Sequence, residues 1–266
     1  GPAMTQRTVL ITGASSGIGA ELAACFAASG NHVILVARST DKLKALASQL
    51  KTTYGIKAWS MTCDLSQTGA AEVLFNQVRN SKRTVDMLVN CAGILEHGAF
   101  VKMPPQRHQD MIDLNLSALT AMLAAFIPPM VERGFGRVLN VASIAAFQPV
   151  PSLATYAATK AYVLSLTESL AEELAGTGVT ITALCPGITA TPMMASAQQH
   201  SPALVVPGFV VGNASAVAAE GYAACMRGDV VCVPGTVNLL TTLASRATPK
   251  WLLRKVSGVF GRRSIG

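Results

Sequence analysis

Tyr156 and Lys160 are the two side chains whose types and spacing point most directly to acid/base chemistry. They lie four residues apart in a segment that predicts a helix from about Ala154, so both fall on one face, one turn apart. A tyrosine with a pKa of about 10 is a poor base at neutral pH. A cation about 4.5 Å away contributes roughly 3 to 4 kcal/mol at an effective dielectric constant of about 20, which lowers that pKa by roughly two to three units. The pair can therefore exchange a proton in the working range.

Ser143 and Asn115 supply two further groups for the same chemistry. Ser143 ends a predicted strand thirteen residues before Tyr156, and its hydroxyl can donate to a carbonyl oxygen that becomes negative. Asn115 lies on a preceding predicted helix and is suited to hold a water that links Lys160 to solvent. A mid-helix asparagine can also bond neighbouring backbone alone, and a lone Tyr or Ser is more often packing than catalysis. Four compatible residues together favour proton transfer to a substrate oxygen.

A glycine-rich turn at Thr12–Gly19 predicts a phosphate-binding site. It joins an apolar run to a helical pattern with the spacing G-x-x-x-G-x-G, and the residues of interest are Gly13, Ser15, Ser16, Gly17, Ile18 and Gly19. Glycine permits the tight turn and the close approach of backbone to pyrophosphate, and the following helix offers N–H groups. A structural turn also explains a bare glycine triplet, but the strand–turn–helix context favours a dinucleotide.

The end of the second predicted strand indicates which dinucleotide. It reads Val36-Ala37-Arg38-Ser39, without the acid that usually holds a free ribose 2′-OH. A guanidinium is a bidentate partner for a 2′-phosphate, with Ser15 or Ser16 as further donors. NADP(H) is therefore predicted over NAD(H). The alternative is that Arg38 is a solvated surface residue.

These residues need a scaffold, and the apolar runs predict one. Continuous apolar strands alternate with helix-length segments, at 8–11, His32–Ala37, Ala58–Cys63, Met87–Asn90, Gly136–Ala142, Thr180–Cys185 and Val230–Val233, with helices at Thr40–Tyr54 and near 213–226 among them. Continuous rather than alternating apolar strands are typical of a parallel sheet covered on both faces. The prediction is an α/β, doubly wound (Rossmann) sheet. Ligands then bind at the carboxyl ends of the strands, where Asp64-Leu65 would set the adenine edge and Asn90, Ala92 and Gly93 a wall beside the ribose.

Composition favours one domain over residues 1–266 and excludes several function classes. Half of the residues are apolar and 13% are charged. Residues 1–3 read as a tag remnant, 190–213 as a substrate lid and 237–266 as a basic extension. The six cysteines lack paired spacing, so neither a metal site nor a disulfide framework is indicated. We see no run of about 18 uncharged apolar residues and no leader, and we expect a cytoplasmic protein.

The formal charge of +7 is unevenly distributed. After Asp229 there is no acid, but six cations follow: Arg246, Lys250, Arg254, Lys255, Arg262 and Arg263. Nucleic-acid binding is not expected, because no basic stripe interleaved with aromatics runs through the body. The tail could contact a membrane or an acidic carrier protein, but a helix that closes the pocket or a subunit interface is favoured.

Residues 8 to about 193 resemble the short-chain dehydrogenase/reductase family. The resemblance rests on TGASSGIG, NCAG at 90–93, Asn115, Ser143, YAATK at 156–160 and Pro186-Gly187-Ile188-Thr189. It implies Tyr156 as catalytic acid/base, Lys160 as its modulator and ribose ligand, Ser143 as donor to the substrate oxygen and Asn115 as relay. It also implies cofactor contacts from Pro186 and Gly187, and nicotinamide carboxamide contacts from Ile188 and Thr189. Cys91 is a departure, since many members carry a second Asn there. A homodimer or homotetramer is expected by the same resemblance.

The predicted lid suggests the substrate. No charged residue lies between Glu173 and Glu220, and Met193 and Met194 are adaptable packers that suit a pocket or a core equally. Phe147, Gln148 and Pro149 would form the opposite wall, with Gln148 as a polar contact. We expect hydride transfer between NADP(H) and a carbonyl or secondary alcohol of an apolar substrate, such as a 3-oxoacyl, alicyclic or steroid-like ketone. The alternatives are a non-catalytic NADP(H)-binding regulator and an epimerase or dehydratase for nucleotide sugars; the uncharged lid argues against the second.

Overall fold

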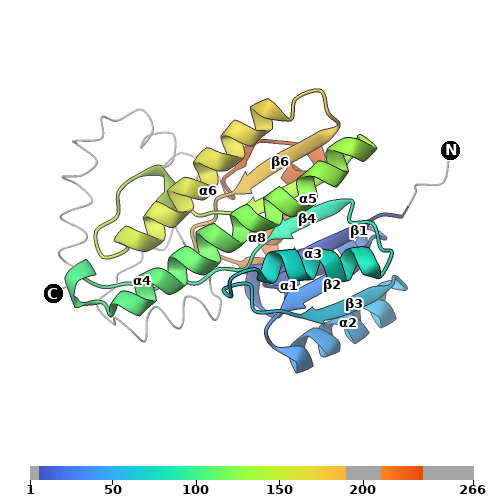
Figure 1. Cartoon of the computed structure of the whole chain (residues 1–266), viewed down its shortest axis with the longest axis horizontal. Helices are drawn as coiled ribbons and strands as arrows, with labels where there is room; N and C mark the ends of the chain where they lie inside the picture. The colour runs from blue at the N-terminus through green and yellow to red at the C-terminus, as the bar shows by residue number, and fades with distance from the viewer. Residues whose placement is uncertain (1–5, 190–210, 236–266) are drawn as a thin grey trace.

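A seven-stranded parallel sheet forms the centre of the computed structural model, which describes residues 6–189 and 211–235 (Figure 1). The strands lie in the order β3-β2-β1-β4-β5-β6-β9. Their bounds are β1 Thr8–Thr12, β2 His32–Ala37, β3 Ala58–Thr62, β4 Met87–Asn90, β5 Gly136–Val141, β6 Val179–Leu184 and β9 Val231–Cys232. The chain order reverses between β1 and β4, and this is where an open α/β sheet binds its ligand. A small second sheet pairs β7 (Ile188–Thr189) with β8 (Val211–Gly212).

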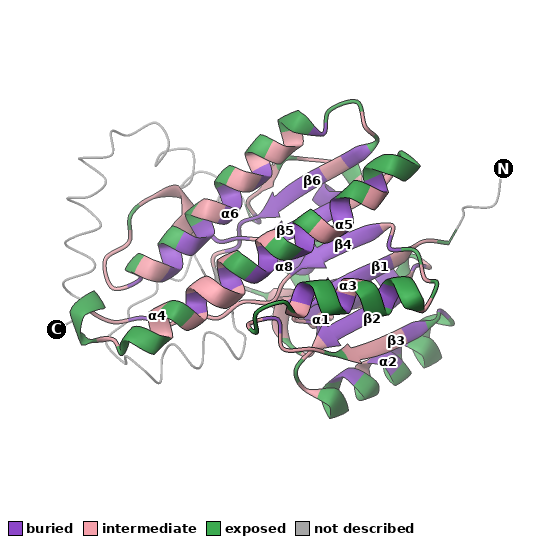
Figure 2. Cartoon of the chain, viewed as in Figure 1, coloured by how far each residue is buried: buried purple, intermediate pink, exposed green. Residues whose placement is uncertain are grey.

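Helices cover both faces of the large sheet. One core layer contains side chains of α1 (Gly17–Ala28), α2 (Thr40–Tyr54) and α8 (Ala214–Arg227). The other contains side chains of α3 (Ala70–Asn80), α5 (Leu119–Arg133) and α6 (Ala154–Glu173), which cross the near face in Figure 1. The strands between them are largely buried, whereas the helices keep an exposed side (Figure 2). The doubly wound α/β fold predicted from the sequence is confirmed.

The predicted elements match those observed except at their ends. The strand His32–Ala37 and the helix Thr40–Tyr54 have the predicted bounds. The fifth strand ends at Val141 rather than Ala142, the sixth is shifted by one residue, and the last is shortened to Val231–Cys232. These differences lie where a strand passes into a loop, because the apolar run continues after the ladder has ended.

A long helix on the near face corrects the expectation that no segment could cross a bilayer. α4 (Pro105–Met111), the π-helical η2 (Ile112–Ala118) and α5 follow one another without a break. Over Pro105–Arg133 they form a 29-residue helix with a window of mean hydropathy 1.6, which is long and apolar enough for a span by length and composition alone. Of that window, 44% is buried inside the structure.

Two short 3₁₀ turns, η1 (Phe100–Lys102) and η3 (Ile144–Phe147), complete the described elements near the site.

Candidate active site

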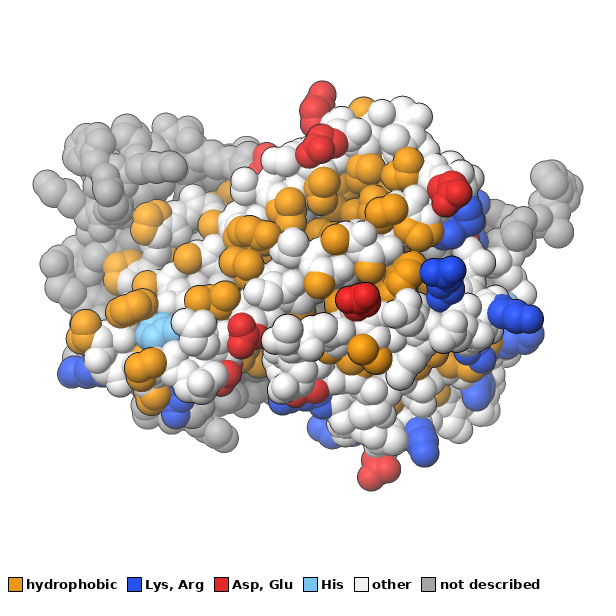
Figure 3. Space-filling view, in the orientation of Figure 1, with side chains coloured by type: hydrophobic (Ala, Val, Ile, Leu, Met, Phe, Trp, Pro, Cys, Tyr) orange, Lys and Arg blue, Asp and Glu red, His pale blue; other side chains and the backbone are white. Residues whose placement is uncertain are grey.

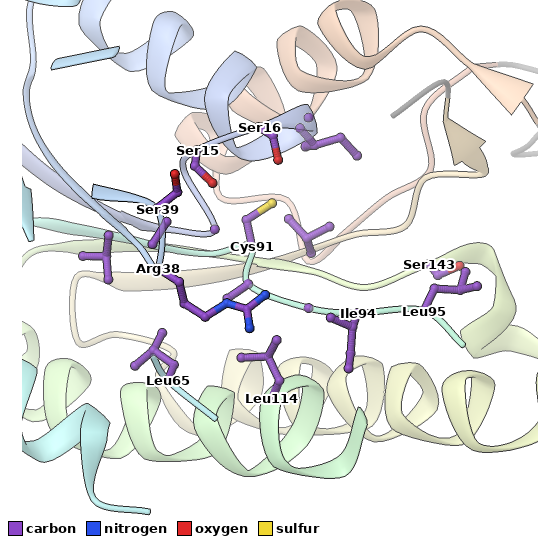
Figure 4. Close-up of a pocket in the computed structure, with 18 of the residues that line it drawn as sticks. Ser15, Ser16, Arg38, Ser39, Leu65, Cys91, Ile94, Leu95, Leu114 and Ser143 are labelled. Atoms are coloured by element: carbon purple, nitrogen blue, oxygen red, sulfur yellow. The ribbon is translucent and has the colours of Figure 1, made fainter. Parts of the chain in front are cut away.

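A groove of about 390 Å³ opens at the carboxyl ends of the central strands (Figure 4). Its size falls within the usual range of small-molecule sites, roughly 300 to 1,000 Å³. Most of the residues predicted for the site line it: Gly13, Ser15, Ser16, Gly17, Ile18, Arg38, Asp64, Leu65, Ala92, Gly93, Ser143, Tyr156, Lys160, Pro186 and Gly187. The fold thus brings one continuous site together from six separate strand ends.

The glycine turn has the geometry of a phosphate cradle. Gly13 and Gly17 have φ values of +61° and +58°, a region that favours glycine. A Cβ on Gly13 would lie 2.8 Å from the backbone nitrogen of Ala92, so any side chain would push the walls apart. α1 begins at Gly17 with no acid in its first turn, and Ser16 makes no side-chain cap. The first N–H groups of α1 therefore remain available to an anion.

A cationic corner closes the β2 end of the groove. Arg38 follows β2 and extends into the groove, with Ser15 and Ser39 near its base (Figure 4). Lys42, on the first turn of α2, also lines the groove and was missed by the sequence reasoning. Its position four residues after Arg38, just inside a predicted helix, is the signal that could have identified it.

Asp64 lines the groove after β3, and its carboxylate is hydrogen-bonded to a neighbouring residue. Its carboxylate accepts hydrogen bonds from the backbone N–H and the hydroxyl of Ser66 at 3.1 and 2.6 Å. These bonds lower the pKa of Asp64, and the charge of Arg38 adds to the effect. Asp64 therefore stays ionised at this wall and can accept from a polar edge, as the adenine prediction requires.

Tyr156, Lys160 and Ser143 meet at the other end of the groove. Tyr156 and Lys160 are 7% and 6% exposed, and the Lys160 Nζ lies 5.6 Å from the centroid of the Tyr156 ring. The Lys160 Nζ donates to the carbonyl oxygen of Val141 at 3.1 Å. Ser143 is the N-cap residue of η3, and its hydroxyl oxygen accepts from the N–H of Ala145 at 3.1 Å. All three groups thus border one small, largely dry space.

Burial dominates the electrostatics of this space when no cofactor is present. It raises the pKa of Tyr156 to about 12, with hydrogen bonding from Ser143 opposing the rise. It lowers the pKa of Lys160 to about 8, against the opposing influence of the Cys91 and Cys185 thiols. The phenol pKa is therefore raised in this cofactor-free site, and the lowering predicted from Lys160 together with a positively charged nicotinamide stays a prediction. Desolvation by burial is the largest influence on the phenol pKa.

Asn115 lies beside the groove rather than on its lining. Its Oδ1 accepts from the N–H of Ile94 at 2.8 Å, and its Nδ2 donates to the carbonyl oxygen of Ile94 at 2.9 Å and to Thr159 Oγ1 at 3.3 Å. Both Nδ2 hydrogens are used, and one lone pair of Oδ1 remains. A Cβ on Gly93 would lie 3.1 Å from that Oδ1 and 3.5 Å from Lys160 Nζ, so both polar atoms border the same spot. Asn115 thus holds the groove wall against α6.

The remaining predicted residues take other places. Gly19 packs against the backbone of Gly13. Asn90 points its amide away from the groove, to Asn140. Gln148 does not line the groove. Ile188 and Thr189 form β7, and nothing is described of their side chains; Met193 and Met194 lie outside the described residues. Ile94, Leu95 and Leu114 line the groove without having been predicted to do so, and Cys91 lines it as part of the predicted segment 90–93.

Comparison with known proteins gives one consistent result. The family model described as short chain dehydrogenase matches residues 7–202. A putative ketoacyl reductase of Streptomyces coelicolor is 36% identical over 197 residues, which is 73% of this chain and 75% of that protein. A short-chain dehydrogenase from Sphingobium yanoikuyae, solved with NADPH, has a TM-score of 0.80 and 32% identity over 90% of this chain and 92% of that one. A bulky-bulky ketone specific alcohol dehydrogenase from Comamonas testosteroni has a TM-score of 0.76 and 29% identity, with the same coverage. The chain belongs to the short-chain dehydrogenase family and is a nicotinamide-dependent oxidoreductase.

Proposed function

We propose that the chain is a cytoplasmic, NADPH-dependent reductase of an apolar ketone. The observation that carries this proposal is the meeting of Ser143, Tyr156 and Lys160 at one end of a groove whose other end is a glycine turn. The six free cysteines of the described residues suit a reducing compartment. The cationic corner supports the preference for NADPH, since Arg38 and Lys42 offer two charges to a 2′-phosphate and the residue directly after β2 is Arg38 rather than an acid.

The residues present fit the dinucleotide. Gly13 has no side chain, so the pyrophosphate can come close to the backbone there. The first N–H groups of α1 can donate hydrogen bonds to the same pyrophosphate. Asp64 and Leu65 would border the adenine, and Ala92 and Gly93 the ribose. When bound, NADPH supplies the hydride. The chain's own residues then have to orient the carbonyl, exclude water and deliver one proton.

Tyr156 is the proposed proton donor. At neutral pH its phenol is protonated, because its pKa lies far above 7, so it can donate to the carbonyl oxygen as negative charge develops there. Ser143 adjoins the phenol and donates a second hydrogen bond to the same oxygen. Lys160, at 5.6 Å from the ring, stabilises the phenolate that remains.

Proton return to the phenolate is proposed to pass along the Asn115 side of the site. Lys160 is almost fully buried, so its ammonium needs a polar neighbour to exchange protons with solvent. The spare lone pair of Asn115 Oδ1 lies near Lys160 Nζ and suits a bridging water. Asn115 thus keeps the role in a proton relay that the sequence predicted, and its amide also holds the backbone of Ile94 in the groove wall.

An apolar substrate is favoured by the lining near Ser143. Ile94 and Leu95 border the groove there, and no described charged residue other than Lys160 joins them at that end. The likeness to a dehydrogenase named for bulky ketones and to a ketoacyl reductase supports a 3-oxoacyl or cyclic ketone. Met193, Met194 and Gln148 remain proposed substrate contacts.

The test is a rate panel with both cofactors. NADPH and NADH oxidation would be followed with 3-oxoacyl thioesters, cyclic ketones, steroids and aromatic aldehydes. The proposal predicts turnover with at least one ketone class and faster rates with NADPH. Tight NADPH binding without turnover of any carbonyl would contradict it and favour the non-catalytic regulator.

A further inference from the structure

A buried chain of side-chain hydrogen bonds crosses the sheet below the active site. The Nδ2 of Asn90 on β4 donates to the Oδ1 of Asn140 on β5 at 3.0 Å. The Nδ2 of Asn140 donates to the Oγ1 of Thr167 on α6 at 3.0 Å. The Thr167 hydroxyl donates in turn to the carbonyl oxygen of Val163 at 2.7 Å. Two strands and the helix that carries Tyr156 and Lys160 are thereby tied together.

Each hydrogen bond in this series has a defined donor and acceptor, and the residues that form it are shielded from water. Asn90 is 4% exposed, while Asn140 and Thr167 are fully buried. Because the Thr167 hydrogen points to Val163, the Thr167 oxygen is the acceptor that the Asn140 amide needs. Removal of that hydroxyl leaves a buried N–H group without a partner, which is costly in a dry interior.

Thr167 and Lys160 form two anchor points of α6 on the same strand. They are seven residues apart, which is close to two turns, so they share the face of α6 that packs on the sheet. The Thr167 hydroxyl is held by the side chain of Asn140, and Lys160 is held by the carbonyl of the next residue, Val141. Two residues of β5, Asn140 and Val141, therefore fix the position of α6 and of the Tyr156 and Lys160 side chains that it carries.

We infer that Asn140 and Thr167 are positioning residues, which fix α6 so that Tyr156 and Lys160 reach the reacting carbonyl. This inference rests on the proposed function for its effect on turnover. Neither residue lines the groove. Their contribution therefore acts through the helix and leaves the glycine turn and the Ala92–Gly93 wall in place for the cofactor.

The experiment compares Thr167→Val, which keeps the shape and removes the hydroxyl, with Thr167→Ser, which keeps the hydroxyl. Leu50→Ala is the control, because Leu50 is 2% exposed and packs in the opposite core layer on α2. Three quantities are measured: kcat per NADPH-binding site, the Kd of NADPH by fluorescence titration, and amide hydrogen exchange over 154–163 without cofactor. Thr167→Ala replaces the valine variant if that variant fails to fold.

The expected result is a kcat about ten- to a hundredfold lower in Thr167→Val, because a displacement of about 1 Å has that effect on catalysis. The Kd of NADPH stays within about threefold, exchange over 154–163 is faster, and Thr167→Ser restores both properties. Leu50→Ala lowers the melting temperature without either change. Parent-like kcat and parent-like exchange in Thr167→Val would overturn the inference, as would equal loss in the serine variant. If the parent protein itself turns over no carbonyl, the proposed function fails, and the exchange comparison still decides whether the hydroxyl anchors α6.

Discussion

Replacement of Arg38 by leucine tests the cofactor preference most specifically. Arg38 follows β2, extends into the groove, and has no ion pair among the described residues, so its guanidinium is available to a 2′-phosphate. A hydrogen bond to a charged group contributes about 1.5 to 3 kcal/mol. Arg38 is exposed and Lys42 lines the same groove, so we take the lower half of that range. The expected loss in kcat/KM for NADPH is about ten- to fiftyfold, with little change for NADH.

Initial rates against each cofactor at saturating ketone measure this directly. Lys44→Leu is the matched control, because Lys44 lies on the same helix as Lys42 but does not line the groove. Its kcat/KM values should stay within about twofold of the parent for both cofactors, as is usual for surface substitutions. If Arg38→Leu lowers the NADPH and NADH values by the same factor, Arg38 is not reading the 2′-phosphate and the assignment is refuted.

Three further predictions concern the buried site and the helix faces. Because the folded-state pKa of Lys160 is lowered to about 8 from 10.5, the unfolded chain binds more protons between those values, and this residue adds stability as pH rises through the window. The raised pKa values of the thiols and Tyr156 have the opposite effect on stability at high pH, so urea unfolding should be compared between the parent and Lys160→Met. The parent should gain about 2 kcal/mol relative to the variant from pH 7.5 to 10, and a constant difference would contradict the burial effect. Gly93→Ala would crowd Asn115 and Lys160, and kcat should fall about tenfold with a lowered melting temperature; a parent-like kcat would show that the contact is unimportant. Apolar side chains gather over α5 and α6 in Figure 3, and Ala124 on α5 and Ala161 on α6 are exposed. Light scattering should therefore show a dimer or tetramer, which Ala124→Arg or Ala161→Arg dissociates. A monomeric parent would refute this expectation, which rests on the family resemblance.

The scaffold could be predicted because its signals are local. β2 is a continuous apolar run that ends at Ala37, and α2 is a helix-length segment that begins at Thr40, so both were located residue for residue. The glycine turn and the Tyr156–Lys160 spacing likewise depend on a few neighbouring positions. Parallel strands then bring these local motifs to one edge of the sheet without further information.

The parts that could not be predicted depend on contacts between distant segments. Asn115 bonds Ile94, 21 residues away, from a π-helical segment that a 3.6-residue periodicity does not reveal. Asn90 was expected at the cofactor, but its partner Asn140 is 50 residues away. The pKa of Tyr156 follows from burial by the whole fold, whereas its spacing from Lys160 accounts for a charge effect alone.

The most direct test of the central claim is a comparison of turnover and cofactor binding in Tyr156→Phe. This change removes the proton donor and keeps the ring that packs against Leu95, Met111 and Leu153. The account predicts NADPH binding within about threefold of the parent together with a loss of kcat of at least about a hundredfold, the scale of general acid catalysis. Ketone reduction at the parental rate by Tyr156→Phe would contradict it.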